Sequence, residues 1–260
     1  MVTRRAFSTA LLTGIATSVV GISAPARATQ LASRNVVLIH GLYADGSSWS
    51  DVIPRLQAAG MRATAVQTTL RSFADDVALT RLVLGMQDGP TVLVAHSFGG
   101  MILSETGVHP SVSSLVYVAA RAPDAGENYA GLAARFPKPP ASAGLVTTDG
   151  FQQLNRDAFL NDFANGVDPA KARLLYAVQA QNAATLPATA KTTVAAWRSK
   201  PSWYAVSKQD RTINPNLERF MAARMKATTI EVNAGHLSLI SHPREIAGLI
   251  LAAAGGQATI

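Results

Sequence analysis

Residues 92–100, with the sequence VLVAHSFGG, constrain the fold of this chain more than any other stretch. The apolar run before His96 is typical of a strand buried in a parallel sheet, and the residues after Gly99 and Gly100 have helical spacing. A strand that passes so abruptly into a helix places Ser97 at the apex of a tight turn, beyond the sheet edge. Backbone N–H groups at the helix start lie near such a serine, so the stretch suits a nucleophile. The alternative is an ordinary strand-to-helix turn with an incidental serine.

The rest of the chain repeats this alternation of strand and helix. Apolar, β-branched runs predict strands at residues 35–41, 61–67, 91–95, 112–120, 203–207 and 228–232. Amphipathic spacing predicts helices from Ser47 or Ser48 to Gly60, and at residues 73–86, 100–108, 215–225 and 244–254. With 48% hydrophobic and 15% charged residues, the 260-residue chain can build a large core. The predicted fold class is α/β, with three layers around a mainly parallel sheet.

The alternation is interrupted between residues 121 and 200. This segment has no strong strand pattern, and it predicts helices over residues 124–136, 151–163 and 168–182 with prolines between them. We therefore expect a helical lid inserted before the penultimate strand, over the edge where α/β proteins bind ligands. The α/β core would then consist of residues 29–120 and 201–260. The alternative is an additional packing layer that encloses no pocket.

The first 28 residues have the pattern of an export signal that is removed. Arg4-Arg5 precedes an uncharged run of apolar and small residues from Leu11 to Ile22, and Ala26-Arg27-Ala28 matches an A-x-A cleavage site. The arginine pair suggests the bacterial twin-arginine route and predicts a periplasmic or secreted protein. The run is too short for stable membrane insertion, although a membrane anchor or a disordered N-terminus is the alternative. Cleavage would leave 20 basic and 16 acidic residues and lower the net charge from +7 to +4.

Composition and motifs exclude several other classes of function. The chain has no cysteine, which rules out disulfides, a thiol nucleophile and cysteine metal sites. It has no basic run or basic-aromatic stripe that would suit nucleic acid. There is no GxGxxG, Walker or HExxH pattern and no metal-ligand spacing among the five histidines, so we expect no cofactor and no metal. Nothing in the sequence indicates an oligomeric state.

Three reactive side chains follow predicted strands in the order Ser97, Asp210 and His236. Because the carboxyl ends of parallel strands meet at one sheet edge, we expect the three to lie together. A serine hydroxyl needs an imidazole to take its proton, and the imidazole needs a carboxylate to fix its tautomer. Asp124 is an alternative acid, but it lies several residues beyond its strand. The remaining histidines lie before prolines, as His109 and His242 do, or in the flanking turns, as His40 and His96 do.

Four segments together resemble a known family. Val36–Trp49 (VVLIHGLYADGSSW), the AHSFGG turn, the strand ending in SKQD and the closing AGHLSLISHP are similar to α/β-hydrolase-fold serine hydrolases. The resemblance is closer to the esterase and hydroxynitrile-lyase-like branch with a small helical cap, and it covers nearly all of residues 34–254. One departure is Ala95, which occupies the first position of the usual G-x-S-x-G motif; a small residue still fits inside the turn.

The resemblance implies a role for each residue of the predicted site. Ser97 would be the nucleophile, His236 the general base and then acid, and Asp210 the acid that orients the histidine. The oxyanion hole would consist of the backbone N–H groups of Leu42 and Phe98.

The predicted function is that of an exported carboxylic-ester hydrolase acting on a small or medium, mostly uncharged ester. Aromatic residues near the site are candidate pocket walls, chiefly Trp49, Trp197 and Tyr43, although core or lid packing is the favoured interpretation of each. One alternative function is a triad-based lyase, which usually needs an added cationic or polar group; Lys208 lies near Asp210 but is expected to face solvent. Another is a ligand-binding sensor on the same scaffold. The acyl and alcohol groups are left open.

Overall fold

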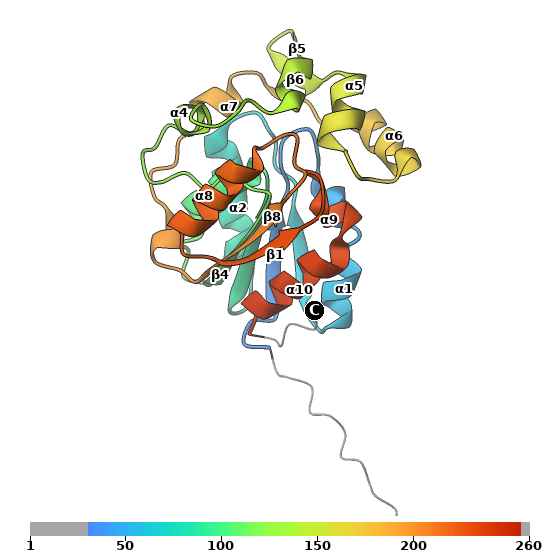
Figure 1. The fold of residues 1–260 in the computed structure, drawn as a ribbon. Helices are drawn as coiled ribbons and strands as arrows, with labels where there is room; N and C mark the ends of the chain where they lie inside the picture. Colours follow the sequence, from blue (N-terminus) through green and yellow to red (C-terminus); the bar gives the residue numbers. More distant parts are fainter. Residues whose placement is uncertain (1–30, 256–260) are drawn as a thin grey trace, which may run out of the picture.

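The computed structural model describes residues 31–255, so the expected export signal at residues 1–28 lies outside the described part (Figure 1). Its centre is a six-stranded, fully parallel sheet with the order β2-β1-β3-β4-β8-β9. The strands are β1 (Asn35–Ile39), β2 (Arg62–Val66), β3 (Thr91–His96), β4 (Val112–Val118), β8 (Ser202–Ser207) and β9 (Thr228–Val232). The predicted fold class is confirmed.

Helices cover both faces of this sheet. On one face, α1 (Ile53–Ala58) and α10 (Pro243–Ala253) pack against each other, and Figure 1 shows them side by side in the lower part of the molecule. On the other face, α2 (Phe73–Gly85) contacts α3 (Gly99–Thr106), while α8 (Pro215–Arg224) packs on β8. Every residue of β1 and β3 is buried, as expected for central strands covered on both sides.

The first predicted helix is wrong in its extent. In place of one helix from Ser47 or Ser48 to Gly60, the chain forms a 3₁₀ turn, η1 (Gly46–Trp49), followed by the shorter α1. Asp45, not a serine, caps this turn by accepting a hydrogen bond from the N–H of Ser47 at 2.7 Å. Pro54 then occupies the start of α1, where its missing N–H has no cost.

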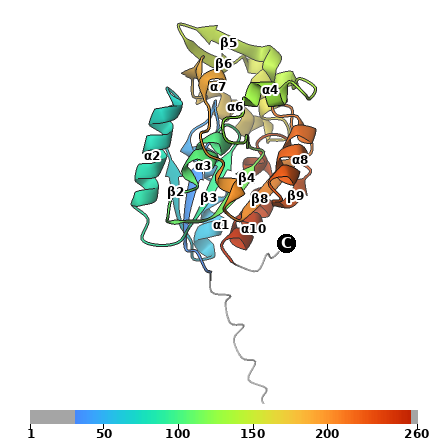
Figure 2. The ribbon, with the colours of Figure 1, turned by 90° about the vertical axis from the view of Figure 1, so that its left-hand side faces the viewer.

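The segment between β4 and β8 lies over the carboxyl edge of the sheet (Figure 2). It contains α4 (Tyr129–Ala133), η2 (Pro140–Gly144), α5 (Arg156–Ala158), the π-helical turn η3 (Phe159–Phe163), α6 (Pro169–Ala177), α7 (Leu186–Thr189) and η4 (Ala196–Arg198). It also contains an antiparallel sheet with the order β5-β6-β7, made of Leu145–Thr148, Phe151–Leu154 and Asn182–Ala183. We call residues 121–200 the cap.

The small cap sheet corrects the expectation of a segment without strands. Asp149 and Gly150 have φ angles of +48° and +79°, which are the values of a two-residue hairpin turn joining β5 to β6. Residues 151–154 therefore extend as a strand, and helix begins only after Asn155, whose side chain accepts from the N–H of Ala158. The helices predicted over 124–136 and 168–182 are likewise shorter, at Tyr129–Ala133 and Pro169–Ala177.

Candidate active site

Ser97 sits at the turn between β3 and α3 with a φ angle of +53°. Such a left-handed conformation is costly for a serine, and strain of this kind at a strand-to-helix turn is characteristic of an exposed nucleophile. Gly99 makes the turn possible, because a Cβ at that position would lie 2.6 Å from the carbonyl oxygen of His40. Within residues 31–255, the Ser97 hydroxyl has no hydrogen-bond partner, so its oxygen is free for chemistry.

Asp210 and His236 form a buried hydrogen-bonded pair after β8 and β9. His236 Nδ1 lies 2.6 Å from Asp210 Oδ2, and both side chains are fully buried. The second carboxylate oxygen of Asp210 accepts from the N–H groups of Thr212 and Ile213, at 2.6 and 2.9 Å. Because an ionised carboxylate only accepts, His236 donates from Nδ1, and in the neutral imidazole Nε2 is then the nitrogen that can accept a proton. No group in the described chain occupies that Nε2.

The loop after β1 also contacts the serine. A Cβ on Gly41 would lie 2.6 Å from Ser97 Cβ and 3.2 Å from its Oγ, so the backbone of this loop contacts the nucleophile directly. Leu42 follows Gly41, and Phe98 follows Ser97. The N–H groups of Leu42 and Phe98 have no acceptor among the residues that the structure describes. Two unused donors beside a serine are what an oxyanion hole requires.

His96 has a structural part in this arrangement. Its Nε2 lies 3.0 Å from the carbonyl oxygen of His236, and the two rings are 4.6 Å apart. Burial, followed by the nearby His236, holds the pKa of His96 well below its ordinary value. A neutral His96 therefore donates to the backbone of the histidine loop and positions it.

Glu218 is a buried carboxyl group that sequence reasoning did not single out. It lies on α8 with no exposed surface, and its Oε2 accepts from the N–H of Ser207 at 3.0 Å. Burial raises its pKa well above the ordinary value, and the adjacent negative charge of Asp210 raises it further. Glu218 is therefore a neutral acid beside the Asp210–His236 pair. The only available signal was its place on the predicted helix 215–225, which does not distinguish it from a solvated glutamate.

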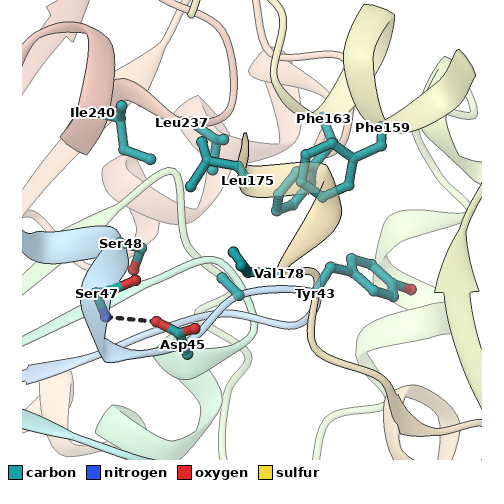
Figure 3. Close-up of a pocket in the computed structure, with 11 residues that line it drawn as sticks. Tyr43, Asp45, Ser47, Ser48, Phe159, Phe163, Leu175, Val178, Leu237 and Ile240 are labelled. Carbon is teal, nitrogen blue, oxygen red and sulfur yellow. Dashed lines mark hydrogen bonds between the residues drawn. The ribbon is translucent and has the colours of Figure 1, made fainter. Parts of the chain in front are cut away.

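Two cavities flank these residues and share Tyr43 in their walls. The first is small, about 20 Å³, and Figure 3 shows Phe159 and Phe163 of the cap on one side of it, with Asp45 and Ser47 on another. The Phe163 ring is 5.3 Å from the ring of His236, which places this cavity beside the histidine. The second has a volume of about 200 Å³, and Thr212 and Ile213, which bind Asp210, belong to its wall.

Of the three candidate pocket residues, only Tyr43 lines either cavity. Trp49 is completely buried in the core. Trp197 is buried as well, with its Nε1 donating to the carbonyl oxygen of Pro123 at 3.1 Å. The structure therefore places both tryptophans in packing roles, because each ring is enclosed by neighbouring chain and not turned to these cavities.

The competing polar residues have other partners. The carboxylate of Asp124 accepts from Arg198 Nε, at 2.7 Å, and from Arg198 Nη2, whereas the carboxylate that binds His236 is that of Asp210. His40 accepts from the N–H of Thr68, at 3.2 Å, and burial lowers its pKa. His109 and His242 pair with the neighbouring hydroxyls of Ser111 and Ser241, and Lys208 is exposed.

Between residues 31 and 255, no group of three or more acidic or histidine side chains is placed to hold a metal ion. Over the same range, none of the helices combines the length and apolar character needed to cross a bilayer.

A parallel sheet with a serine turn and a buried histidine–aspartate pair at one edge defines an α/β-hydrolase-type protein. Residues 36–249 match the Alpha/beta hydrolase family, and the chain belongs to this family. The resemblance to α/β hydrolases expected from the sequence is confirmed.

Two curated relatives match part of the chain. The carbendazim hydrolyzing esterase of Nocardioides sp. (strain SG-4G) is 30% identical over 126 residues, which is 43% of this chain and 52% of that protein. Methylesterase 7 of Arabidopsis thaliana is 33% identical over 107 residues, 35% of this chain and 41% of that protein. The chain thus matches about half the length of these relatives. Among solved structures, a pyrethroid hydrolase from Sphingobium faniae JZ-2 has a TM-score of 0.70 at 20% identity, covering 86% of this chain and 98% of that one.

Proposed function

We propose that the chain is a carboxylic-ester hydrolase that works through an acyl-enzyme. The observation that carries this proposal is the buried Asp210–His236 pair, whose free Nε2 lies at the same sheet edge as the strained Ser97 turn. His236 takes the proton of the Ser97 hydroxyl as the oxygen attacks the ester carbonyl. The N–H groups of Leu42 and Phe98 stabilise the negative oxygen of the tetrahedral intermediate.

The same groups complete the reaction. Protonated His236 gives its proton to the departing alcohol, which leaves Ser97 esterified by the acyl group. A water molecule then attacks the acyl carbon while His236 accepts its proton, and the acid and the free serine hydroxyl are released. Asp210 stays ionised throughout and stabilises the imidazolium form of His236.

The substrate of this proposal is a small-molecule ester. Both cavities are modest in size, and the first is walled mainly by apolar side chains such as Phe159, Phe163 and Leu175. The curated relatives are named a carbendazim hydrolyzing esterase and a methylesterase, which favours ester hydrolysis here. We further propose that the protein is exported, on the sequence of residues 1–28 alone; sequencing the N-terminus of the secreted or periplasmic protein tests this.

The decisive experiment measures p-nitrophenyl acetate turnover and fluorophosphonate labelling in matched variants. Ser97→Ala should abolish both signals, and Asp210→Asn should reduce kcat by about 10³- to 10⁴-fold. Asp124→Asn is the control, since its carboxylate binds Arg198, and it should retain turnover. Turnover and labelling that persist in Ser97→Ala would refute the proposal.

The two alternative functions differ in the same assays. Cyanide release from a cyanohydrin without ester turnover would identify a lyase instead. Tight ligand binding without a burst or turnover on any ester would identify a sensor.

A further inference from the structure

Arg121 begins the cap and is fixed to the backbone of the serine turn. It lies three residues after β4, and its N–H donates to the carbonyl oxygen of Ser97 at 2.9 Å. This main-chain bond sets the position from which the side chain departs. A change in the Arg121 side chain therefore leaves the bond to Ser97 in place.

The guanidinium of Arg121 is held between aromatic rings. Its central carbon is 4.7 Å from the ring centre of Tyr129 and 5.4 Å from that of Phe98. Stacking of this kind orients the flat guanidinium and leaves its edges free for a bidentate acceptor. Phe98 is also the residue whose N–H belongs to the proposed oxyanion hole, so both the backbone and the side chain of Arg121 contact residues of the serine turn.

The hydrogen-bonding capacity of this arginine is unused. Across residues 31–255, Arg121 forms no ion pair and no side-chain hydrogen bond, and its Nε is buried without any partner. Its Nη1 and Nη2 groups are not enclosed in this way and bind no described residue, so they are available to an acceptor in the adjoining cavity. Arg224, whose Nε likewise has no partner, binds Glu127 through its Nη1 and Nη2 groups at 2.9 and 3.0 Å, whereas the Nη groups of Arg121 bind no carboxylate of the described residues.

Arg121 is the sole charged side chain in the wall of the 200 Å³ cavity, as far as the structure describes that wall. The two tyrosines there are neutral, because burial raises the pKa of Tyr43 and of Tyr129 to about 12 despite the nearby arginine. The acids nearest to Tyr129 are Asp210 and Glu218, which are bound to His236 and to the Ser207 N–H. Arg121 is thus the one charged side chain of the described cavity wall, and the ionised Asp210 beyond that wall is already bound to His236, Thr212 and Ile213.

We propose that Arg121 binds a carboxylate of the substrate, so that the preferred substrates are esters that carry a carboxylate at the far end, such as half-esters of dicarboxylic acids. This inference rests on the proposed hydrolase function, and it replaces the expectation of an uncharged ester. In the reaction, water adds to the acyl carbon, the acyl–oxygen bond breaks, and the alcohol, a new carboxylate and one proton are released. The guanidinium contributes binding and orientation only.

Two matched substrate pairs test this. Monomethyl glutarate against dimethyl glutarate places the carboxylate on the acyl side, and acetoxyacetate against methyl acetoxyacetate places it on the alcohol side. In the wild type we expect a higher kcat/KM for the carboxylate member of at least one pair. In Arg121→Met that ratio should fall by about tenfold or more, chiefly through KM, and Arg121→Lys should give an intermediate ratio.

Arg135→Met is the matched control. Arg135 also stacks on an aromatic ring, 5.3 Å from the centre of Phe220, but it is exposed and is not part of the cavity wall. Its substrate ratio should stay at the wild-type value. Calorimetric titration of Ser97→Ala with glutarate measures binding of the carboxylate without turnover, and we expect binding. The double variant Ser97→Ala, Arg121→Met should lose that binding.

The outcomes separate the two proposals. Absence of Ser97-dependent turnover together with glutarate binding through Arg121 would refute the hydrolase and retain the anion site. Equal kcat/KM for both members of each pair, unchanged in Arg121→Met, would overturn the role of Arg121 and leave the hydrolase standing. If circular dichroism shows that Arg121→Met does not fold, Arg121→Lys is tested in its place. An unchanged ratio of kcat/KM between the members of each substrate pair in Arg121→Lys would also overturn the role of Arg121.

Discussion

Replacing Glu218 by glutamine should make the protein more stable at neutral pH, although it alters a fully buried residue. Glu218 is held protonated by burial and by the adjacent Asp210 charge, so its folded-state pKa lies well above the ordinary value of 4.5. Tyr129, Tyr204 and the half-buried Arg219 are the other titratable groups that interact with it. Glutamine mimics the protonated acid and keeps an acceptor for the Ser207 N–H.

The sign and size follow from proton linkage. An acid with a raised folded-state pKa favours folding fully below pH 4.5, and this contribution is lost as pH rises toward the raised value. The variant should therefore equal the wild type near pH 4.5 and gain about 1.4 kcal/mol for each further pH unit until the raised pKa is reached. By pH 6.5 the variant would be more stable by at most about 3 kcal/mol.

Urea unfolding of both proteins at pH 4.5, 5.5, 6.5 and 7.5 measures this difference. Glu231→Gln is a control of opposite sign, because the hydrogen bond from Arg219 lowers the pKa of the exposed Glu231. That variant should lose stability relative to the wild type above pH 4.5. A constant difference between wild type and Glu218→Gln across the whole range would refute the assignment of a neutral Glu218.

Two further predictions concern the serine turn and the buried histidines. Gly41→Ala places a Cβ 2.6 Å from Ser97 Cβ, so kcat for p-nitrophenyl acetate should fall by about 10²-fold. Gly85→Ala is the control, because the space around Gly85 is open, and its kcat should not change. An unchanged kcat in Gly41→Ala would contradict the contact with the serine. Burial lowers the pKa of both His40 and His96. The free energy of unfolding is therefore highest above pH 6.5, and it decreases as the pH drops below 6.5, by up to about 1.4 kcal/mol per pH unit for each histidine. Urea unfolding between pH 6.5 and 5.5, in the Glu218→Gln background to remove the opposing effect of Glu218, checks this, and equal stability at the two pH values would exclude it.

The core of the fold could be predicted because its signals are local. Strands such as β1 and β3 are continuous apolar runs, and each is followed by a turn or cap that is readable in the sequence. Parallel strands then bring Ser97, Asp210 and His236 to one edge whatever the side chains between them do. The Asp210–His236 hydrogen bond was therefore foreseeable from the order of strand ends, and the choice of Asp210 over Asp124 agrees with the partner that each one has.

The cap was predicted poorly because its structure depends on tertiary contacts. Phe151–Leu154 has no strand pattern of its own, and it extends because the Asp149-Gly150 turn pairs it with Leu145–Thr148. That dipeptide was visible in the sequence, but no flanking alternation supported a hairpin. Trp49 and Trp197 were candidates for the pocket only because of their place along the chain, which says nothing about which way a ring faces, and both lie in the packing role that was favoured for them. The neutral state of Glu218 depends on its burial beside Asp210, and the proposed role of Arg121 depends on the cavity that it lines. A single sequence shows neither burial nor cavities.

The hydrogen bond from the Arg121 N–H to the Ser97 carbonyl has a consequence for how this protein can be recombined. That bond uses main-chain atoms only, and the chain re-enters the sheet at β8, from Ser202 onward. A cap from a relative, joined at residues 122 and 201, would therefore leave the turn and its anchor intact. Such a swap would exchange cap residues of the 200 Å³ cavity, such as Tyr129 and Leu154, while its charged residue, Arg121, stays with the nucleophile.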